Sequence, residues 1–237
     1  LENGIKIPYS AKEEVSYFPD QEISWAVKYF FDALYYRELG EFQTKAHTFI
    51  DYIDSRDEKY QAVHCELADL MKQKESLKIL DIGCGKGRYL KKMFYTYPQN
   101  EYYGIDLSEM VLRFVKNPKI KVSTGSILNT GCKNEEFDLV FAAESLEHAI
   151  FIDLAIKEMV RVTKVGGSVV IIDKDKTAFD RVKYKEWIIP EELSTKQWLD
   201  TEEIRNVFQK NNLVDIRIYD LPSPEGKMYK AYIGRRA

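Results

Sequence analysis

The stretch Leu80-Asp81-Ile82-Gly83-Cys84-Gly85-Lys86-Gly87 decides the fold of this chain. An apolar run over 77–82 leads into three alternate glycines, and a helical pattern begins directly after them. This order predicts a strand, a tight turn and the start of a helix. Glycine adopts backbone angles that other side chains forbid and lets a ligand approach the main chain, so the turn is expected to cradle a ligand.

The spacing of the glycines separates two classes of cofactor site. A nicotinamide-binding loop of the form GxGxxG requires glycine at position 88, where this chain has Arg88. The spacing Asp-x-Gly-x-Gly-x-Gly instead resembles motif I of class I S-adenosylmethionine-dependent methyltransferases. This resemblance covers about residues 77–235. It implies S-adenosylmethionine as the cofactor, S-adenosylhomocysteine as the product, and a loop that passes under the methionine end of the cofactor.

Two further segments extend the expected cofactor site. Asp106 ends a predicted strand, and a carboxylate there can accept hydrogen bonds from both hydroxyls of a ribose; the alternative is a turn aspartate that caps the next helix with Ser108. The next predicted strand leads to Ser126, where family members often have an aspartate that binds the adenine amino group. Serine can accept that bond as a neutral group. The cofactor-binding set implied by the resemblance is Asp81, Gly83, Cys84, Gly85, Gly87, Asp106, Leu107, Ser126, Ile127 and Glu144.

The segment Glu144-Ser145-Leu146-Glu147-His148 follows a fourth predicted strand. It resembles the segment in small-molecule methyltransferases where the strand end faces both cofactor and acceptor. His148 is the candidate catalytic base, because an imidazole with a pKa of about 6.5 suits proton transfer near neutral pH. Glu144 is expected to contact cofactor or substrate and is the second catalytic candidate. For His148 the alternative is a structural hydrogen bond that fixes the loop.

The same five residues also match the Glu-x-x-Glu-His pattern of metal-using relatives. In those relatives, the positions of Glu144, Glu147 and His148 would hold Mg²⁺, a hard cation that prefers oxygen ligands. Only one histidine is present here, and the metal-free Leu-Glu-His version is common in the family. The expectation is therefore no metal, with Mg²⁺ as the disfavoured alternative.

Alternating strands and helices predict an α/β fold. The resemblance implies a Rossmann-like, doubly wound, seven-stranded sheet that is mostly parallel with an antiparallel last strand. The expected domains are an N-terminal helical lid or extension, 1–76, and a cofactor-binding domain, 77–237. Strands are expected at 77–82, 101–106, 119–124, 137–143, 168–173, 214–219 and 230–233. Helices are expected at 20–40, 42–53, 60–71, 89–98, 150–163 and 201–211. Thr201 is expected to cap the last helix, and a Gly166-Gly167 turn is expected to lead into the strand at 168–173.

Acceptor specificity is expected in two segments. The aromatic residues at 29–31, 35 and 36 either contact substrate or pack in the core. The loop 174–200 mixes lysines and arginines with Trp187 and Trp198. Such a loop could receive a phosphate or carboxylate of the acceptor, or could be a solvated charged loop. His47 and His64 are expected to be structural or solvated.

Composition restricts the partners and the compartment. The chain has 237 residues and a net charge of −3, with 35 basic residues spread among 38 acidic ones, which disfavours nucleic acid as a partner. No apolar run reaches the roughly 18 residues that cross a bilayer, and no signal peptide is recognised. Three cysteines fit neither a disulfide framework nor a zinc site, so the cytoplasm is expected. The first residue is Leu1, so the true start is expected elsewhere. The oligomeric state is left open, and a homodimer is one possibility.

The expected function is methyl transfer from S-adenosylmethionine to an oxygen or nitrogen of a small molecule. A sugar or another biosynthetic intermediate with an anionic group is the suggested acceptor, on the basis of the 174–200 loop. Two alternatives are a methyltransferase for RNA or protein, and a non-catalytic S-adenosylmethionine-binding module, because a fold alone does not establish chemistry.

Overall fold

The computed structural model of the chain divides into two compact units, Leu1–Glu41 and Phe42–Ala237, and each is described by itself. The residues that it describes are 6–10, 13–16, 33, 40, 51–53, 56–72, 76–149, 151–178, 198–222 and 229–237.

In the first unit, β1 (Lys6–Ser10) and β2 (Glu13–Ser16) form an antiparallel hairpin in which Ile7 pairs with Val15. The sequence did not indicate this hairpin, because strands of four and five residues are too short to show a clear period of two. The helices expected at 20–40 and 42–53 lie mostly outside the described residues; Ala33 and Gly40 are helical, whereas 51–53 are not.

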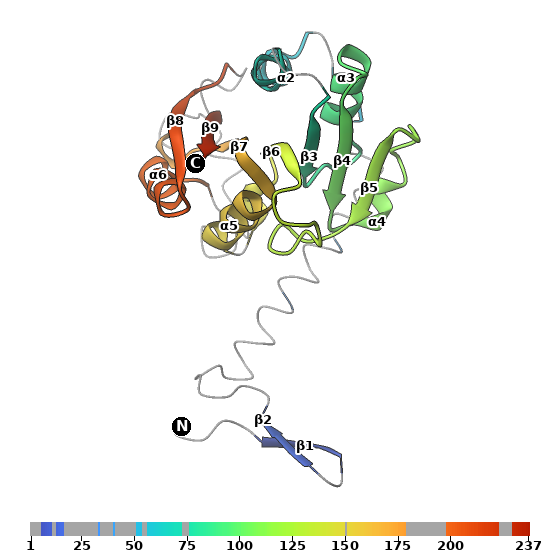
Figure 1. The fold of residues 1–237 in the computed structure, drawn as a ribbon, viewed down its shortest axis with the longest axis vertical. Helices are drawn as coiled ribbons and strands as arrows, with labels where there is room; N and C mark the ends of the chain where they lie inside the picture. The colour runs from blue at the N-terminus through green and yellow to red at the C-terminus, as the bar shows by residue number, and fades with distance from the viewer. Residues whose placement is uncertain are drawn as a thin grey trace, which may run out of the picture. The chain divides into compact units, whose positions relative to one another are not determined.

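The second unit is built on a seven-stranded sheet with the order β5-β4-β3-β6-β7-β9-β8. Neighbouring strands from β5 to β7 run parallel, and β9 runs antiparallel to both β7 and β8 (Figure 1). The predicted Rossmann-like fold is confirmed, including the antiparallel last strand. The strands are β3 (Lys78–Ile82), β4 (Glu101–Asp106), β5 (Ile120–Thr124), β6 (Phe137–Ala143), β7 (Thr163–Lys174), β8 (Leu213–Asp220) and β9 (Tyr229–Arg236).

Helices cover both faces of the sheet because its central strands are apolar on both sides. Ile79 packs with one set of helices and its neighbour Leu80 with the other, and both side chains are fully buried. Burial of each contributes about 1.5–3 kcal/mol. The helices on the Ile79 face are α2 (Glu58–Met71), α3 (Arg88–Thr96) and α4 (Glu109–Leu112), and those on the Leu80 face are α5 (Ile152–Val162) and α6 (Thr201–Lys210).

The start of β7 and the N-cap of α6 differ from the sequence prediction. The Gly166-Gly167 pair was expected to be a turn before the strand, but β7 begins at Thr163 and contains both glycines. A Cβ on Gly167 would lie 3.0 Å from the backbone oxygen of Asp138 on β6, so glycine permits close approach of two strands there. At α6 the cap is Asp200 rather than Thr201: Oδ1 of Asp200 accepts the backbone N–H groups of residues 202 and 203.

Because these strands are parallel, the carboxyl ends of β3, β4, β5, β6 and β7 lie at one edge of the sheet. Tyr229, the first residue of antiparallel β9, pairs with Lys174, the last residue of β7, and so lies at the same edge. Most sequence-predicted site residues follow strand ends and therefore lie along this edge. No helix among the described residues is long and apolar enough to span a membrane.

Candidate active site

The glycine loop after β3 has the backbone geometry that its sequence predicts. Gly83, Gly85 and Gly87 have φ angles of +75°, +53° and +70°, which disfavour residues with a side chain. The backbone N–H groups of Gly83 and Cys84 both donate to the carbonyl of Ile105, at 2.7 and 3.0 Å. No described atom lies within 4 Å of the position that a Cβ on Gly85 would occupy. The loop is thus fixed to β4 and exposes its backbone at Gly85.

Asp106 at the end of β4 binds this loop directly. Its Oδ2 accepts the N–H of Gly85 at 2.8 Å, and its Oδ1 accepts the N–H of Ser108 at 2.9 Å. Burial raises the pKa of the Asp106 carboxyl, while these N–H groups and the charge of His148 oppose the rise. Each carboxylate oxygen can accept more than one hydrogen bond, so Asp106 fits the ribose role as well as the turn role.

Two other motif residues have buried side chains. Asp81 is buried within β3, and burial raises the pKa of its carboxyl well above the usual value, opposed by the charge of Arg88. The thiol of Cys84 packs over Gly104, where a Cβ would lie 2.7 Å from its sulfur. Burial raises the pKa of this thiol, which makes it a poor nucleophile. The backbone N–H and carbonyl of Cys84 are likewise engaged, with the Ile105 carbonyl and the Gly87 N–H.

The segments after β4 and β5 place the remaining predicted cofactor residues. Leu107 is half-buried beside Asp106. Ser126 begins a tight turn in which its Oγ accepts the N–H of Leu128 at 3.1 Å, and Ile127 packs against the hydrophobic core on the α5 side. Each therefore lies at the strand end that the sequence indicated.

Glu144, the first residue after β6, is the centre of an ionic cluster. Its Oε1 accepts a hydrogen bond from Arg88 at 2.8 Å, and its Oε2 accepts one from Lys59 at 3.1 Å and one from the hydroxyl of Tyr229 at 3.2 Å. Burial would raise the pKa of Glu144, but the charges of Arg88 and Lys59 hold it below its usual value. The carboxylate is therefore a weak base, better suited to binding than to proton transfer. Its φ of +57° is uncommon outside glycine.

The cluster contains residues that the sequence did not single out for the site. Nζ of Lys59 lies 4.5 Å from the ring centroid of Tyr60 and 4.7 Å from that of Tyr229. The Arg88 guanidinium carbon lies 4.3 Å from the Tyr60 centroid. These cation–π contacts join α2, α3 and β9, which are far apart in the sequence. No local motif marks such residues; only the aromatic and basic positions at the start of α2 could have suggested them.

His148 ends a short 3-10 helix, η2 (Leu146–His148). Its Nε2 lies 3.6 Å from Oε1 of Glu147, and its charge acts on Asp106. The structure therefore brings the predicted base and the predicted ribose-binding acid to the same part of the sheet edge.

The carboxylates that match the metal-using pattern are engaged by protein cations. Glu144 is bound by Arg88 and Lys59, and both oxygens of Glu147 accept hydrogen bonds from Nζ of Lys174 at 2.7 Å. Within the described part of the chain, no group of three or more histidine, cysteine, aspartate or glutamate side chains is arranged to hold a metal ion.

Asp173 gives the fold a specific pH dependence. It is fully buried, and burial together with the charge of Glu147 raises its pKa from 3.8 to about 8. Between these values the folded chain holds a proton that the unfolded chain has released, so stability falls as pH rises. We expect wild type to lose about 1–2 kcal/mol relative to Asp173→Asn between pH 6 and 8. Urea unfolding at both pH values measures this difference, and a constant difference would contradict the prediction.

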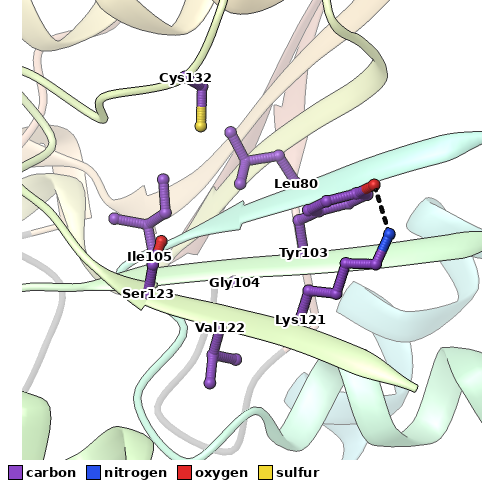
Figure 2. A pocket seen from close by; sticks show the side chains of 8 residues that line it. All are labelled: Leu80, Tyr103, Gly104, Ile105, Lys121, Val122, Ser123 and Cys132. Atoms are coloured by element: carbon purple, nitrogen blue, oxygen red, sulfur yellow. Dashed lines mark hydrogen bonds between the residues drawn. The ribbon is translucent and has the colours of Figure 1, made fainter. Parts of the chain in front are cut away.

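A small cavity lies on the Leu80 face of the sheet, beside β4 and β5 (Figure 2). Residues 125–136, all of them described, form no helix over these strands. Figure 2 shows Tyr103 and Lys121, whose hydroxyl and ammonium are 2.9 Å apart, at one side of the cavity and Cys132 at another. Apart from Cys132, which follows β5, its lining residues lie within β3, β4 and β5, and none of these described residues belongs to the glycine loop.

Known proteins share both sequence and fold with this chain. Residues 80–171 match the family described as "Methyltransferase domain". Tocopherol O-methyltransferase from Arabidopsis thaliana chloroplasts is 27% identical over 173 residues, with 65% of this chain and 49% of that enzyme covered. Demethylmenaquinone methyltransferase from Staphylococcus aureus is 23% identical over 185 residues, with 67% of this chain and 77% of that enzyme covered. The chain thus spans about half the length of the tocopherol relative.

A solved structure shows the same fold. The S-adenosylmethionine-dependent methyltransferase from Aquifex aeolicus superposes with a TM-score of 0.63 at 18% identity, with 82% of this chain and 98% of that chain covered. The shared fold therefore extends over nearly all of the Aquifex aeolicus chain.

Proposed function

Because this chain belongs to the class I S-adenosylmethionine-dependent methyltransferases, we propose that it methylates an oxygen or nitrogen of a small-molecule acceptor. The observation that carries this proposal is the hydrogen bond from the Gly85 N–H to Asp106 at 2.8 Å, which fixes a carboxylate at the glycine loop, while His148 follows β6 on the other side of β3. A cofactor-binding acid and a proton acceptor therefore serve one site.

The proposed cofactor contacts follow from the loop geometry. The exposed backbone at Gly85 leaves room for the methionine end, and Asp106 has acceptor capacity for the ribose hydroxyls. Leu107, Ser126 and Ile127 are proposed to surround the adenine. When bound, S-adenosylmethionine supplies a methyl group on a positively charged sulfur.

His148 is proposed to take the acceptor's proton. A hydroxyl acceptor must lose its proton as the new bond forms, and an imidazole is the side chain most often used to take a proton near neutral pH. An amine that arrives unprotonated needs less help. Glu144, whose pKa is held low by Arg88 and Lys59, is proposed to fix the strand end and to bind cofactor or substrate rather than to accept the proton.

A small-molecule acceptor is supported by the relatives, which are named for tocopherol and demethylmenaquinone. Lys59, Lys174 and Lys230, three of the lysines described at this edge, each form an ion pair with a carboxylate, which disfavours a basic track for a nucleic acid there. An anionic group on the acceptor is proposed from the sequence of the 174–200 loop, whose residues 179–197 lie outside the described part of the chain.

Calorimetric titration with S-adenosylhomocysteine and with NAD, followed by an acceptor screen that detects S-adenosylhomocysteine release, tests the proposed function. The screen begins with phenols, quinols and anionic sugars. Binding of the sulfur cofactor without binding of NAD, together with turnover on one of these acceptors, supports the proposal. A chain that binds neither S-adenosylmethionine nor S-adenosylhomocysteine would overturn it.

We expect His148→Ala to lower kcat by about 100-fold to 10,000-fold on a hydroxyl acceptor, because removal of a general base has effects of this size. The affinity for S-adenosylhomocysteine should stay within about twofold, since the imidazole is not proposed to bind the cofactor. Steady-state kinetics and calorimetry measure the two quantities. Normal turnover in the variant would remove His148 from the mechanism.

A further inference from the structure

Glu147, between the proposed base and the end of β7, has no role in the proposed reaction so far. Both of its oxygens accept hydrogen bonds from Nζ of Lys174 at 2.7 Å, and its backbone N–H donates to Oδ2 of Asp173 at 3.0 Å. Oδ1 of Asp173 accepts the backbone N–H of Lys174 at 2.9 Å. The end of β7 therefore fixes both the backbone and the side chain of Glu147.

This fixed carboxylate lies beside the imidazole of His148. Oε1 of Glu147 is 3.6 Å from Nε2 of His148, and the Glu147 side chain is 3% exposed. The distance is longer than a hydrogen bond but short enough for a direct ionic interaction. Because water is excluded from the carboxylate, its field on the ring is weakly screened. A proton on Nε2 is therefore favoured over a proton on Nδ1.

We propose that Glu147, held by Lys174, is a positioning residue for His148. It orients the ring and keeps the proton of the neutral imidazole on Nε2, so Nδ1 is the nitrogen that takes a proton. As the acceptor is methylated, the electron pair of its X–H bond stays on X and forms the bond to the methyl carbon. The proton passes to Nδ1 and later leaves to water. This role rests on the proposed function of His148 as the base.

Lys174 adjusts the strength of this interaction. A buried carboxylate without a cation beside His148 would stabilise the imidazolium strongly, and a ring that stays protonated at neutral pH cannot accept a proton. The ammonium of Lys174 offsets that charge. A purely structural explanation is weaker, because the desolvation penalty of a buried ion pair largely cancels its attraction.

Other titratable groups lie on the elements around His148. Asp106 from β4 acts on it electrostatically. Asp173 and Lys174 from β7 contact Glu147, and α5, which packs against η2, has Asp153 in its first turn. Asp173 responds to both substitutions, because the charge of Glu147 raises its pKa and the charge of Lys174 lowers it. The variants are therefore also compared in an Asp173→Asn background, where the difference from the unsubstituted chain reports the substituted residue alone.

Nitrogen-15 NMR titration of the histidine side chains in the full chain tests the proposal without an acceptor. The chain has three histidines, and loss of its signals in His148→Gln assigns His148. We expect the neutral His148 ring of wild type to be the Nε2–H tautomer. Glu147→Gln should lower the His148 midpoint by about 0.5 pH unit or more, and Lys174→Met should raise it. Glu158→Gln is the matched control, because Glu158 is a buried carboxylate paired with Arg161 instead.

An unchanged His148 midpoint in both Glu147→Gln and Lys174→Met overturns the proposal, as does an Nδ1–H tautomer in wild type. Thermal unfolding identifies a variant that fails to fold; Glu147→Asp then replaces Glu147→Gln, with a smaller expected shift.

The pH profile of kcat/KM separates this proposal from the proposed function. Its acid limb should move to lower pH in Glu147→Gln by the same amount as the NMR midpoint, because only the unprotonated ring accepts a proton. A shifted midpoint with an unshifted rate profile overturns His148 as the base, whereas an unshifted midpoint overturns only the role of Glu147.

Discussion

Asp106→Ala is expected to weaken the binding of S-adenosylhomocysteine by about 100-fold. Hydrogen bonds to a charged group contribute roughly 1.5–3 kcal/mol each, and a loss of about 2.8 kcal/mol corresponds to 100-fold in affinity. The variant also removes the acceptor of the Gly85 N–H, which fixes the loop. Calorimetric titration of the variant and the wild type measures the change.

Two further variants make this result specific. Asp106→Asn keeps the size of the side chain and removes its charge, so its loss of affinity should be intermediate. Asp138→Asn removes a carboxylate from the opposite end of the same sheet, where it pairs with Lys164, and should bind the cofactor as wild type does. An Asp106→Ala protein with wild-type affinity would contradict the ribose role.

Gly83→Ala is expected to lower the free energy of unfolding by about 3 kcal/mol or more. A Cβ on Gly83 would lie 2.4 Å from Cβ of Ser145, and the φ angle is +75°. Overpacking costs about 1–3 kcal/mol, and the left-handed conformation about 1–2 kcal/mol for a residue with a Cβ. Urea unfolding monitored by circular dichroism measures the loss.

Gly131→Ala separates the two contributions. Gly131 has nearly the same φ, +73°, but no described atom lies within 4 Å of its Cβ position. This control should therefore lose only about 1–2 kcal/mol. In the double variant Gly83→Ala/Ser145→Gly, part of the stability lost in Gly83→Ala should return, because the side chain that collides is gone. The single variant Ser145→Gly measures the cost of losing the hydrogen bond from Ser145 to the Ile82 carbonyl, and that cost is subtracted. Equal losses in Gly83→Ala and Gly131→Ala would show that the collision with Ser145 is unimportant.

The elements with the strongest local pattern were predicted well. The strands 101–106 and 137–143 have the bounds expected from the sequence, because apolar residues flanked by turn residues mark their ends. The third N-terminal helix, expected at 60–71, is confirmed as α2, Glu58–Met71. The start of β7 was misplaced because a glycine pair resembles a turn, although here it permits close strand contact.

Site residues that follow a predicted strand could be found from the sequence, whereas their partners from distant parts of the chain could not. The glycine loop, Asp106 and His148 each follow a predicted strand, so their common edge could be inferred from the alternation of strands and helices. Lys59 and Tyr229 could not be inferred, because they are 85 positions from Glu144 on either side and share no motif with it. The charge and hydrogen bond of Lys59 also favour the ionised form of Glu144, so this carboxylate is suited to binding rather than to proton transfer.

The sequence by itself determined the sheet, the glycine loop and the acid that follows β4, because these depend on apolar runs and backbone freedom within short segments. Tertiary structure alone decided the electrostatic state of the site. It placed Arg88 and Lys59 against Glu144, and Lys174 against Glu147. Charge interactions depend on distance and burial rather than on chain separation, so the partners of each carboxylate emerge only when the strand ends meet.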